Sequence, residues 1–357
     1  MLTYLTAGES HGQALVAIMQ GIPANLKIDV DKINSQLALR CKGFGRGGRM
    51  AIESDKIEIL AGVRGGITTG APIAFIIENK DYKNWQDIIG VNATKLQDKK
   101  LTAVRPGHAD LAGCIKYNQK DARNILERAS ARNTATQVAI GEICNQFLAE
   151  VGITTNAKVL SIGGESEPKK IREKIELALA LGDTLGGKIE VLAQGLFCGL
   201  GSYISSPTKL EYSLAANLMA IQSVKSVSIG NVEKYETSFG GEVHDELYLS
   251  KQNKIVRKTN NAGGIEGGMS NGEDIVATII CKPIPSVPKG LSSVDIESKK
   301  QTTSAKERGD AVAIEAASVV AKSVLSFVLA KAVLNSTGGD HMDEIKERVK
   351  LKRKAML

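Results

Sequence analysis

The feature that most constrains this sequence is a glycine-rich segment that occurs twice. The segment GVRGGITTGAPIAFIIEN at positions 62–79 is similar to GIEGGMSNGEDIVATIIC at positions 264–281. Identical residues occupy the same register at Gly62/Gly264, Gly65/Gly267, Gly66/Gly268, Gly70/Gly272 and Ile73/Ile275. In each copy a glycine-rich turn precedes an apolar, β-branched run, which is the pattern of a turn that leads into a strand. The repeat therefore predicts two similar structural units.

Further matches between the two parts of the chain occur in the same order. VAIMQGIP precedes the helical pattern DVDKINSQLALR, and VLAQGLF precedes the helical pattern KLEYSLAANLMAI. Two Glu-Arg pairs, in segments 127–150 and 307–331, each lead into a long helical pattern. We therefore expect an internal duplication with halves at about 1–150 and 185–335, packed as one domain over 1–357. The alternation of strands with turns and the length of the helices favour an α+β fold, with helices layered against antiparallel sheets.

Net charge limits the partners of the protein. The formal charge of +7 favours anionic partners, which include nucleic acids, membrane surfaces and phosphorylated small molecules. The basic tail KERVKLKRK at 346–354 has the pattern of a solvated helical end.

Nucleic-acid binding is the alternative hypothesis, but the sequence lacks a recognition-helix signature and stacking aromatics beside the basic clusters. No apolar run reaches the about 18 residues of a membrane span. We therefore expect a small phosphorylated ligand, and neither nucleic acid nor membrane.

Cysteine usage indicates the cellular compartment. The five cysteines are far apart and form no C-x-x-C pair, so neither a zinc site nor a dithiol site is expected. Reduced thiols are typical of the cytoplasm. The first residues lack a basic region followed by an apolar run, which is the pattern of a signal peptide. We expect a cytoplasmic protein without a metal.

The segment GESHG at 8–12 allows two interpretations. It matches the G-x-S-x-G of a hydrolase nucleophile elbow, which needs a strand before the serine and a helix after it. The following QALVAIMQGIP alternates between apolar and polar residues and ends in Gly-Ile-Pro, which is typical of a second strand. A serine hydrolase is therefore disfavoured. The remaining readings are a hairpin turn that presents Ser10 and His11 to a ligand, and a turn with an incidental histidine.

Arginines beside glycines form the next candidate site. The run from Arg40 to Arg49, RCKGFGRGGR, contains a formal G-x-G-x-x-G, but a helical pattern precedes it where a dinucleotide fold needs a strand. We interpret it as a basic loop. Flexible glycines would allow the arginines to close on a phosphate or carboxylate, and a merely solvated loop is the alternative. Its cations are Arg40, Lys42, Arg46 and Arg49.

Three more clusters repeat this chemistry. A Pro-Gly turn presents Arg105, His108 and Asp110 together. Two arginines and a serine in 128–134 lie near a helix start, where backbone N–H groups favour anions. The segment 306–310, KERGD, has the corresponding place in the second half. The two remaining histidines, His244 and His341, are expected at the surface. Together the clusters predict a site for one or two multiply anionic ligands.

Taken together, these motifs resemble the chorismate synthase family. The motifs that carry the resemblance occur in the family's order: GESHG (8–12), RPGHAD (105–110), ERASARNT (127–134), AGGIEGGMSNG (262–272) and ERGDA (307–311). The resemblance implies a lyase that converts 5-enolpyruvylshikimate 3-phosphate to chorismate and phosphate by 1,4-anti elimination, with reduced FMN as cofactor. It also implies a β-α-β sandwich, with long helices between two antiparallel sheets, and a homotetramer.

The resemblance assigns roles to individual residues. His11 is implied to be the acid that faces the leaving phosphate, His108 to manage the proton on reduced flavin, and Asp310 to be the base that assists proton removal at C6. Substrate binding is implied for Ser10, Arg40, Arg46, Arg49, Arg105 and Arg132. FMN binding is implied for Arg128, Ala129, Ser130, Gln222, Ser223, Gly267, Lys282, Pro283, Ile284, Pro285, Ser286 and Arg308. Arg40 and Arg46 also occupy positions linked to NADPH, which some members use to reduce the flavin.

The sequence departs from the family's pattern at several FMN positions. Family members often have Arg-His-Asp-Pro where this chain has Arg-Gly-Asp-Ala at 308–311, and Arg-Ser-Ser where it has Arg-Ala-Ser at 128–130. Gln222-Ser223 replaces Asn-Ala, and Lys-Pro-Ile-Pro-Ser at 282–286 replaces Lys-Pro-Thr-Ser-Ser. The aspartate at 310 is kept, so its role is expected to be kept. At 128–130 one hydroxyl is lost, and at 222–223 and 282–286 we expect FMN contacts from the backbone.

Overall fold

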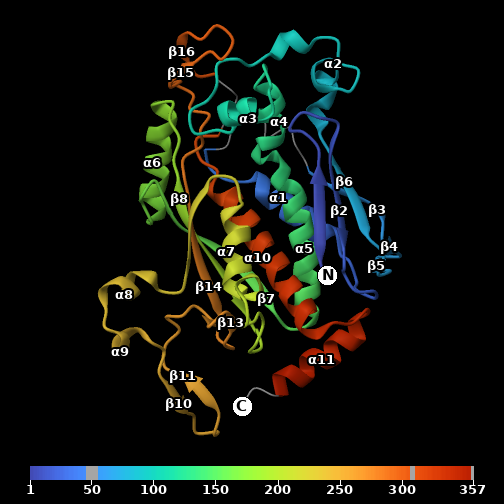
Figure 1. Ribbon diagram of the computed structural model, residues 1–357, viewed down its shortest axis with the longest axis vertical. Helices are drawn as coiled ribbons and strands as arrows, with labels where there is room; N and C mark the ends of the chain where they lie inside the picture. The colour runs from blue at the N-terminus through green and yellow to red at the C-terminus, as the bar shows by residue number, and fades with distance from the viewer. Residues whose placement is uncertain (46–54, 306–309, 355–357) are drawn as a thin grey trace.

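The computed structural model describes residues 1–45, 55–305 and 310–354. Two four-stranded antiparallel sheets dominate it (Figure 1). The first has the order β1-β2-β6-β3, with bounds Thr3–Ala7, Ala14–Gln20, Ile73–Glu78 and Ile57–Ala61. The second has the order β7-β8-β14-β9, with bounds Thr154–Ile162, Gly187–Gln194, Ile275–Cys281 and Val224–Ile229. The expected combination of helices with antiparallel sheets in an α+β fold is confirmed.

The two sheets share one topology. In each sheet the fourth strand along the chain is inserted between the second and the third, and a two-stranded hairpin precedes it. The hairpins are β4–β5 (Val63–Arg64, Ile67–Thr68) and β12–β13 (Ile265–Glu266, Met269–Ser270). β7 lies in the segment 151–184, between the two expected halves.

Equivalent glycines explain why the repeated segment is similar in both sheets. Gly62 has φ +84° and Gly264 has φ +78°, a region that residues with a Cβ adopt at a cost. A Cβ at Gly62 would lie 2.7 Å from the Cα of Ile73, and a Cβ at Gly264 would lie 2.9 Å from the Cα of Ile275. The chain turns tightly against the first residue of the central strand in both units, so both positions require glycine.

Two long helices form the centre of the molecule. α5 (Thr134–Glu150) contacts β2, α10 (Ile314–Thr337) contacts β7 and β8, and the two helices pack against each other (Figure 1). The approach is close because Gly141 of α5 lies directly against Ser323 of α10. α10 is long and apolar enough to cross a membrane by length and composition alone, but its apolar window is 72% buried within the protein. α10 is therefore the core helix.

The other helical patterns also form helices. α1 (Val30–Cys41) follows β2 and α7 (Leu210–Met219) follows β8, as expected. The basic tail belongs to α11, Met342–Lys354, which buries Ile345 and Val349 on one side. The remaining helices are α2 (Gln86–Ile89), α3 (Asp110–Lys116), α4 (Arg123–Ala129), α6 (Pro168–Ala180), α8 (Val232–Thr237) and α9 (Gly240–Val243). The 3-10 turns are η2 (Lys80–Asn84), η3 (Leu96–Lys99), η4 (Ala131–Asn133) and η5 (Ser206–Thr208), and the remaining strands are β10 (Leu247–Leu249), β11 (Ile255–Arg257), β15 (Ser292–Val294) and β16 (Gln301–Thr303).

A second, smaller core joins the two parts of the chain at one end. α3 and α4 contribute Cys114 and Leu126, and partly buried Ile296 and Ala305 from the second part pack against them. Backbone hydrogen bonds run from Ile296 N to Thr102 O and from Ala305 N to Ala103 O. The two parts of the chain are therefore fixed relative to each other at the end where the motifs of the candidate site lie.

Candidate active site

The GESHG segment forms the turn between β1 and β2. A strand follows it and no helix does, so the geometry of a nucleophile elbow is not present there. His11 is buried, and its backbone N–H donates to Glu127 Oε2 over 2.8 Å. Its ring Nδ1 lies 2.9 Å from Glu127 Oε1. The backbone N–H of Ser10 donates to the carbonyl oxygen of Glu127 over 2.9 Å. One residue of α4 therefore holds both the backbone and the side chain of this turn.

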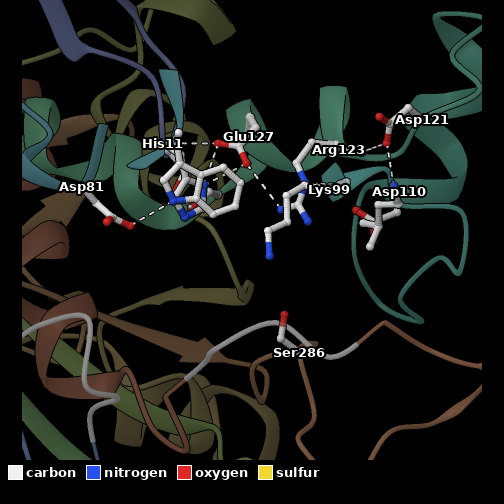
Figure 2. A network of polar contacts seen from close by, with 12 residues as sticks. His11, Asp81, Lys99, Asp110, Asp121, Arg123, Glu127 and Ser286 are labelled. Carbon is white, nitrogen blue, oxygen red and sulfur yellow. Dashed lines mark hydrogen bonds and ion pairs between the residues drawn. The ribbon is translucent and has the colours of Figure 1, made fainter. Parts of the chain in front are cut away.

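Aromatic and cationic groups surround the pair. The imidazole of His11 stacks on the indole of Trp85, with ring centroids 3.9 Å apart and planes 22° apart. Figure 2 shows His11 beside Glu127, with Arg123 on the other side of that glutamate. Trp85 Nε1 donates to Asp81 Oδ2 over 3.0 Å. The guanidinium of Arg123 lies over the same indole, 5.5 Å from its centroid, and 3.5 Å from Glu127 Oε1. The imidazole therefore contacts a carboxylate and an aromatic face. Arg123 is the partner of the Glu127 carboxylate, and Asp81 is the partner of the Trp85 indole.

Two arginines share one buried aspartate beside this turn. Arg132 Nη1 lies 2.6 Å from Asp55 Oδ2, and Arg40 Nη1 lies 3.6 Å from the same oxygen. Arg40 also donates to Thr134 Oγ1 and to the carbonyl oxygen of Ala131. Both guanidinium groups are buried, and burial is favourable for such charges only when anions compensate them. Closely placed buried guanidinium groups are typical of sites that bind phosphate or carboxylate groups.

A chain of contacts connects the two arginines to the GESHG turn. Arg132 Nε donates to Asn79 Oδ1, and Asn79 Nδ2 donates to the carbonyl oxygen of Gly12 over 2.7 Å. Ser130 Oγ lies 3.2 Å from Ser10 Oγ. The guanidinium of Arg128 donates to the carbonyl oxygens of Thr6 and Gly8. Arg128 therefore fixes the end of β1.

The second imidazole belongs to the Pro-Gly turn before α3. His108 Nδ1 lies 2.6 Å from Asp110 Oδ1, and Arg105 Nε donates to Asp110 Oδ2 over 2.8 Å. Burial alone would raise the pKa of Asp110, but hydrogen bonds from His108 and Arg105, together with their charges, hold that pKa well below its usual value. Arg105 Nη1 also donates to Ser286 Oγ over 2.7 Å. The expected grouping of arginine, histidine and aspartate is present.

The segment after β14 completes this second cluster. Lys282 Nζ donates to the carbonyl oxygen of Gly107, and Lys282 N donates to the carbonyl oxygen of Ser223. Thr184 Oγ1 donates to the carbonyl oxygen of Ile284. Among the described residues, Gln222 Oε1 is a buried acceptor without a hydrogen-bond donor. The segment 282–286 therefore lies against Arg105 and His108, with Gln222 and Ser223 next to it.

The basic loop and the segment before α10 also meet. Ala311 N donates to the carbonyl oxygen of Gly45 over 2.9 Å, so Asp310 lies beside the loop that follows α1. Three of the expected site arginines, Arg46, Arg49 and Arg308, lie outside the described residues.

Gly267 and Lys282, two of the FMN candidates, lie at opposite ends of β14 within this chain. Gly267 lies in the β12–β13 hairpin, before the first residue of β14, whereas Lys282 comes directly after the last residue of that strand. The seven residues of β14, at about 3.3 Å each, separate the two positions by roughly 20 Å within one chain. The two surface histidines, His244 and His341, are exposed as expected.

Sequence reasoning did not assign the residues that hold the two imidazoles. Glu127 and Asp110 lie inside motifs that indicate no separate role for them, and Trp85 lies outside every motif. Asp55 lies directly after the undescribed part of the loop and has no motif around it. Arg123 lies one helical turn before Glu127, and this i, i+4 spacing was the only available signal for it.

The fold and the site define an α+β enzyme whose buried arginines and two carboxylate-held imidazoles suit a multiply charged anion. A sequence profile of the chorismate synthase family matches residues 2–334. The chain is 49% identical to the chorismate synthase of Caldanaerobacter subterraneus subsp. tengcongensis, over 97% of this chain and 96% of the relative. It is 47% identical to that of Thermoanaerobacter pseudethanolicus, over 97% of each chain.

A solved structure described as a chorismate synthase crystal structure superposes with a TM-score of 0.78 at 36% identity, over 99% of this chain and 98% of that chain. The chain therefore belongs to the chorismate synthase family, whose members are carbon–oxygen lyases of the shikimate pathway.

Proposed function

We propose that the chain converts 5-enolpyruvylshikimate 3-phosphate to chorismate and phosphate by 1,4-anti elimination, with reduced FMN as cofactor. The observation that carries the proposal is the buried His11–Glu127 pair beside two arginines that share one aspartate. The substrate has a phosphate and two carboxylates, so its site needs an excess of fixed positive charge. Arg132 and Arg40, which both lie against Asp55, support this role.

We assign the leaving-group step to the turn between β1 and β2. A phosphate departs more easily when a hydrogen bond or a proton neutralises its developing charge. His11 is the proton donor in this proposal. Its position is supported by the two contacts to Glu127, which fix the imidazole before substrate arrives. Ser10, whose Oγ accepts a hydrogen bond from Ser130 Oγ over 3.2 Å, supplies the neighbouring hydroxyl in this proposal.

The residues on the other side of the site fit a flavin. Gln222 Oε1 is a buried acceptor that needs a donor, and bound FMN would offer ring N–H groups. Ser130, Ser223 and the segment 282–286 would hold the cofactor, with His108 to hold a proton near it and Asp310 to assist removal of the C6 proton. Reduced FMN, when bound, supplies electron density that weakens the C–O bond to be broken.

Assembly and origin are also proposals. We propose a cytoplasmic homotetramer; the five free thiols favour a reducing compartment. We further propose that the two sheets arose by duplication, with the second unit starting at β7 near residue 154. The common strand order and the equivalent glycines support it.

An anaerobic assay tests the function. The enzyme is mixed with substrate, FMN and dithionite, and chorismate absorbance is followed; turnover is expected. No chorismate under these conditions would refute the proposal. A second arm replaces dithionite with NADPH, and turnover there would show that the chain reduces its own flavin. For that activity Arg40 and Arg46 are the implied NADPH residues, and the guanidinium of Arg40 already binds Thr134 and Ala131.

A further inference from the structure

We propose that Glu127 is the positioning residue of His11: it fixes the ring and its protonated nitrogen and acts on the reaction only through that ring. The proposal builds on the proposed function in taking His11 as the proton donor to the leaving phosphate. Nothing in the motif pattern assigns a role to Glu127. It is 3% exposed, so the carboxylate is held within the protein.

The geometry determines which ring nitrogen carries a proton. An ionised carboxylate accepts hydrogen bonds and donates none, so Nδ1 of His11, at 2.9 Å from Oε1, must be protonated. The other nitrogen, Nε2, is then the atom that gains and loses a proton in the reaction. A second-sphere carboxylate that fixes a tautomer in this way is a recurring device in proton-transfer sites.

The same carboxylate also fixes the backbone of the turn. Oε2 accepts the backbone N–H of His11 over 2.8 Å, and the carbonyl oxygen of Glu127 accepts the N–H of Ser10. Glu127 therefore holds His11 at two points, the backbone N–H and the ring Nδ1. Arg123, one helical turn earlier at 3.5 Å, compensates the buried negative charge.

The indole of Trp85 packs against one face of the His11 ring. The ring centroids lie 3.9 Å apart, so a rotation that tilts the plane of the imidazole would break its stacking contact with the indole. Asp81 in turn fixes the indole through Nε1 at 3.0 Å. The ring is therefore restrained on its face by Trp85 and at Nδ1 by Glu127, and of these two contacts the one to the carboxylate acts on the tautomer.

The test separates positioning from general folding. In Glu127→Gln the amide has one accepting oxygen for two donors, so either the ring or the backbone N–H loses its partner. We expect ¹⁵N NMR of histidine-labelled enzyme to show a shift of the His11 tautomer away from Nδ1–H, and kcat to fall about 100-fold with FMN affinity kept. Comparison with a His11→Asn spectrum identifies the His11 signals among the four histidines.

Two further variants make the result decisive. Glu142→Gln is the matched control, because Glu142 is a buried helical glutamate in α5 whose pKa burial raises, and it should leave both readouts unchanged. Glu127→Asp keeps the charge and should recover part of the loss. If Glu127→Gln does not fold, Glu127→Asp carries the test, with a smaller loss of the Nδ1–H signal and of kcat expected.

The double variant shows whether Glu127 acts through His11. Adding Glu127→Gln to His11→Asn should lower kcat no further, because the ring on which Glu127 acts is already absent. An additional full loss in the double variant, or an unchanged tautomer and kcat in Glu127→Gln, would overturn the proposal. If His11→Asn retains full turnover, the proposed role of His11 fails instead, and the NMR result still decides whether Glu127 fixes the ring.

Discussion

The two imidazoles of the site make the same kind of contact to a buried carboxylate, but the carboxylate is distant in the chain for one and adjacent for the other. Each has Nδ1 against a buried carboxylate that is paired with a buried arginine. His108 receives its carboxylate from Asp110, two residues away in the same turn, whereas His11 receives it from Glu127, 116 residues away. The first cluster is thus a property of a short segment, and the second exists only after the chain has folded.

The second difference lies in what faces each ring. An indole stacks on His11, and the guanidinium of Arg105 lies 3.0 Å from Nδ1 of His108. An aromatic face attracts a positive ring, and a guanidinium repels one. The comparison supports a division of labour in which His11 delivers the proton to the leaving anion, as proposed, while His108 acts near the cofactor.

The largest expected difference between the two sites is in turnover. His11→Asn should lower kcat by about 10²- to 10⁴-fold, because it removes the proton donor to the leaving group, while FMN affinity changes little. His108→Asn should instead alter the absorbance spectrum of bound reduced flavin. Steady-state kinetics and anaerobic flavin titrations measure both effects. Equal losses of turnover and of FMN binding in His11→Asn would contradict the division of labour.

The second largest expected difference between the two sites is in their contribution to the free energy of unfolding. Asp110→Asn leaves Arg105 without its buried carboxylate and should lower the free energy of unfolding by about 3 kcal/mol in urea at pH 7. Because the folded-state pKa of Asp110 is lowered, its stabilisation is present above the unfolded-state pKa of about 3.9 and decreases as pH falls. The difference between wild type and variant should therefore narrow below about pH 5. A difference that is constant down to pH 3 would disprove this account of Asp110.

The smallest expected effect belongs to the indole. Trp85→Leu keeps an apolar side chain at this position but removes the stacked face, which is worth about 1 kcal/mol. We expect kcat to fall by less than tenfold, with the His11 tautomer in ¹⁵N NMR unchanged because Glu127 still determines it. A tautomer change in Trp85→Leu would assign that function to the indole and weaken the distinction between the two supports of the ring.

The difference between local and long-range contacts also determines how much of the site the sequence predicts. The turn Arg105–Asp110 could be read as a unit because its residues are adjacent, and the sheets and long helices could be read because the repeat aligned them. Helix boundaries were less accurate: the expected continuous helix from 127 is interrupted at 130–133, and α10 begins at Ile314. Ser130 Oγ accepts the N–H of Arg132 there and caps a separate turn.

Long-range pairings could not be read from spacing. Glu127 meets His11, and Asp55 meets Arg132, only because the fold places α4 and η4 beside the first sheet. The position of Gly267 illustrates the same limit. Its motif matches the FMN pattern, but the length of β14 separates it from Lys282 within one chain.

The central claim is that the turn held by Glu127 receives the phosphate that leaves. A crystal structure of the enzyme with FMN and 5-enolpyruvylshikimate 3-phosphate tests it most directly. The account predicts a phosphate oxygen within hydrogen-bond distance of the His11 imidazole, near Arg132, with the contact between Nδ1 and Glu127 retained. A phosphate bound away from the β1–β2 turn, with His11 touching no ligand atom, would contradict it.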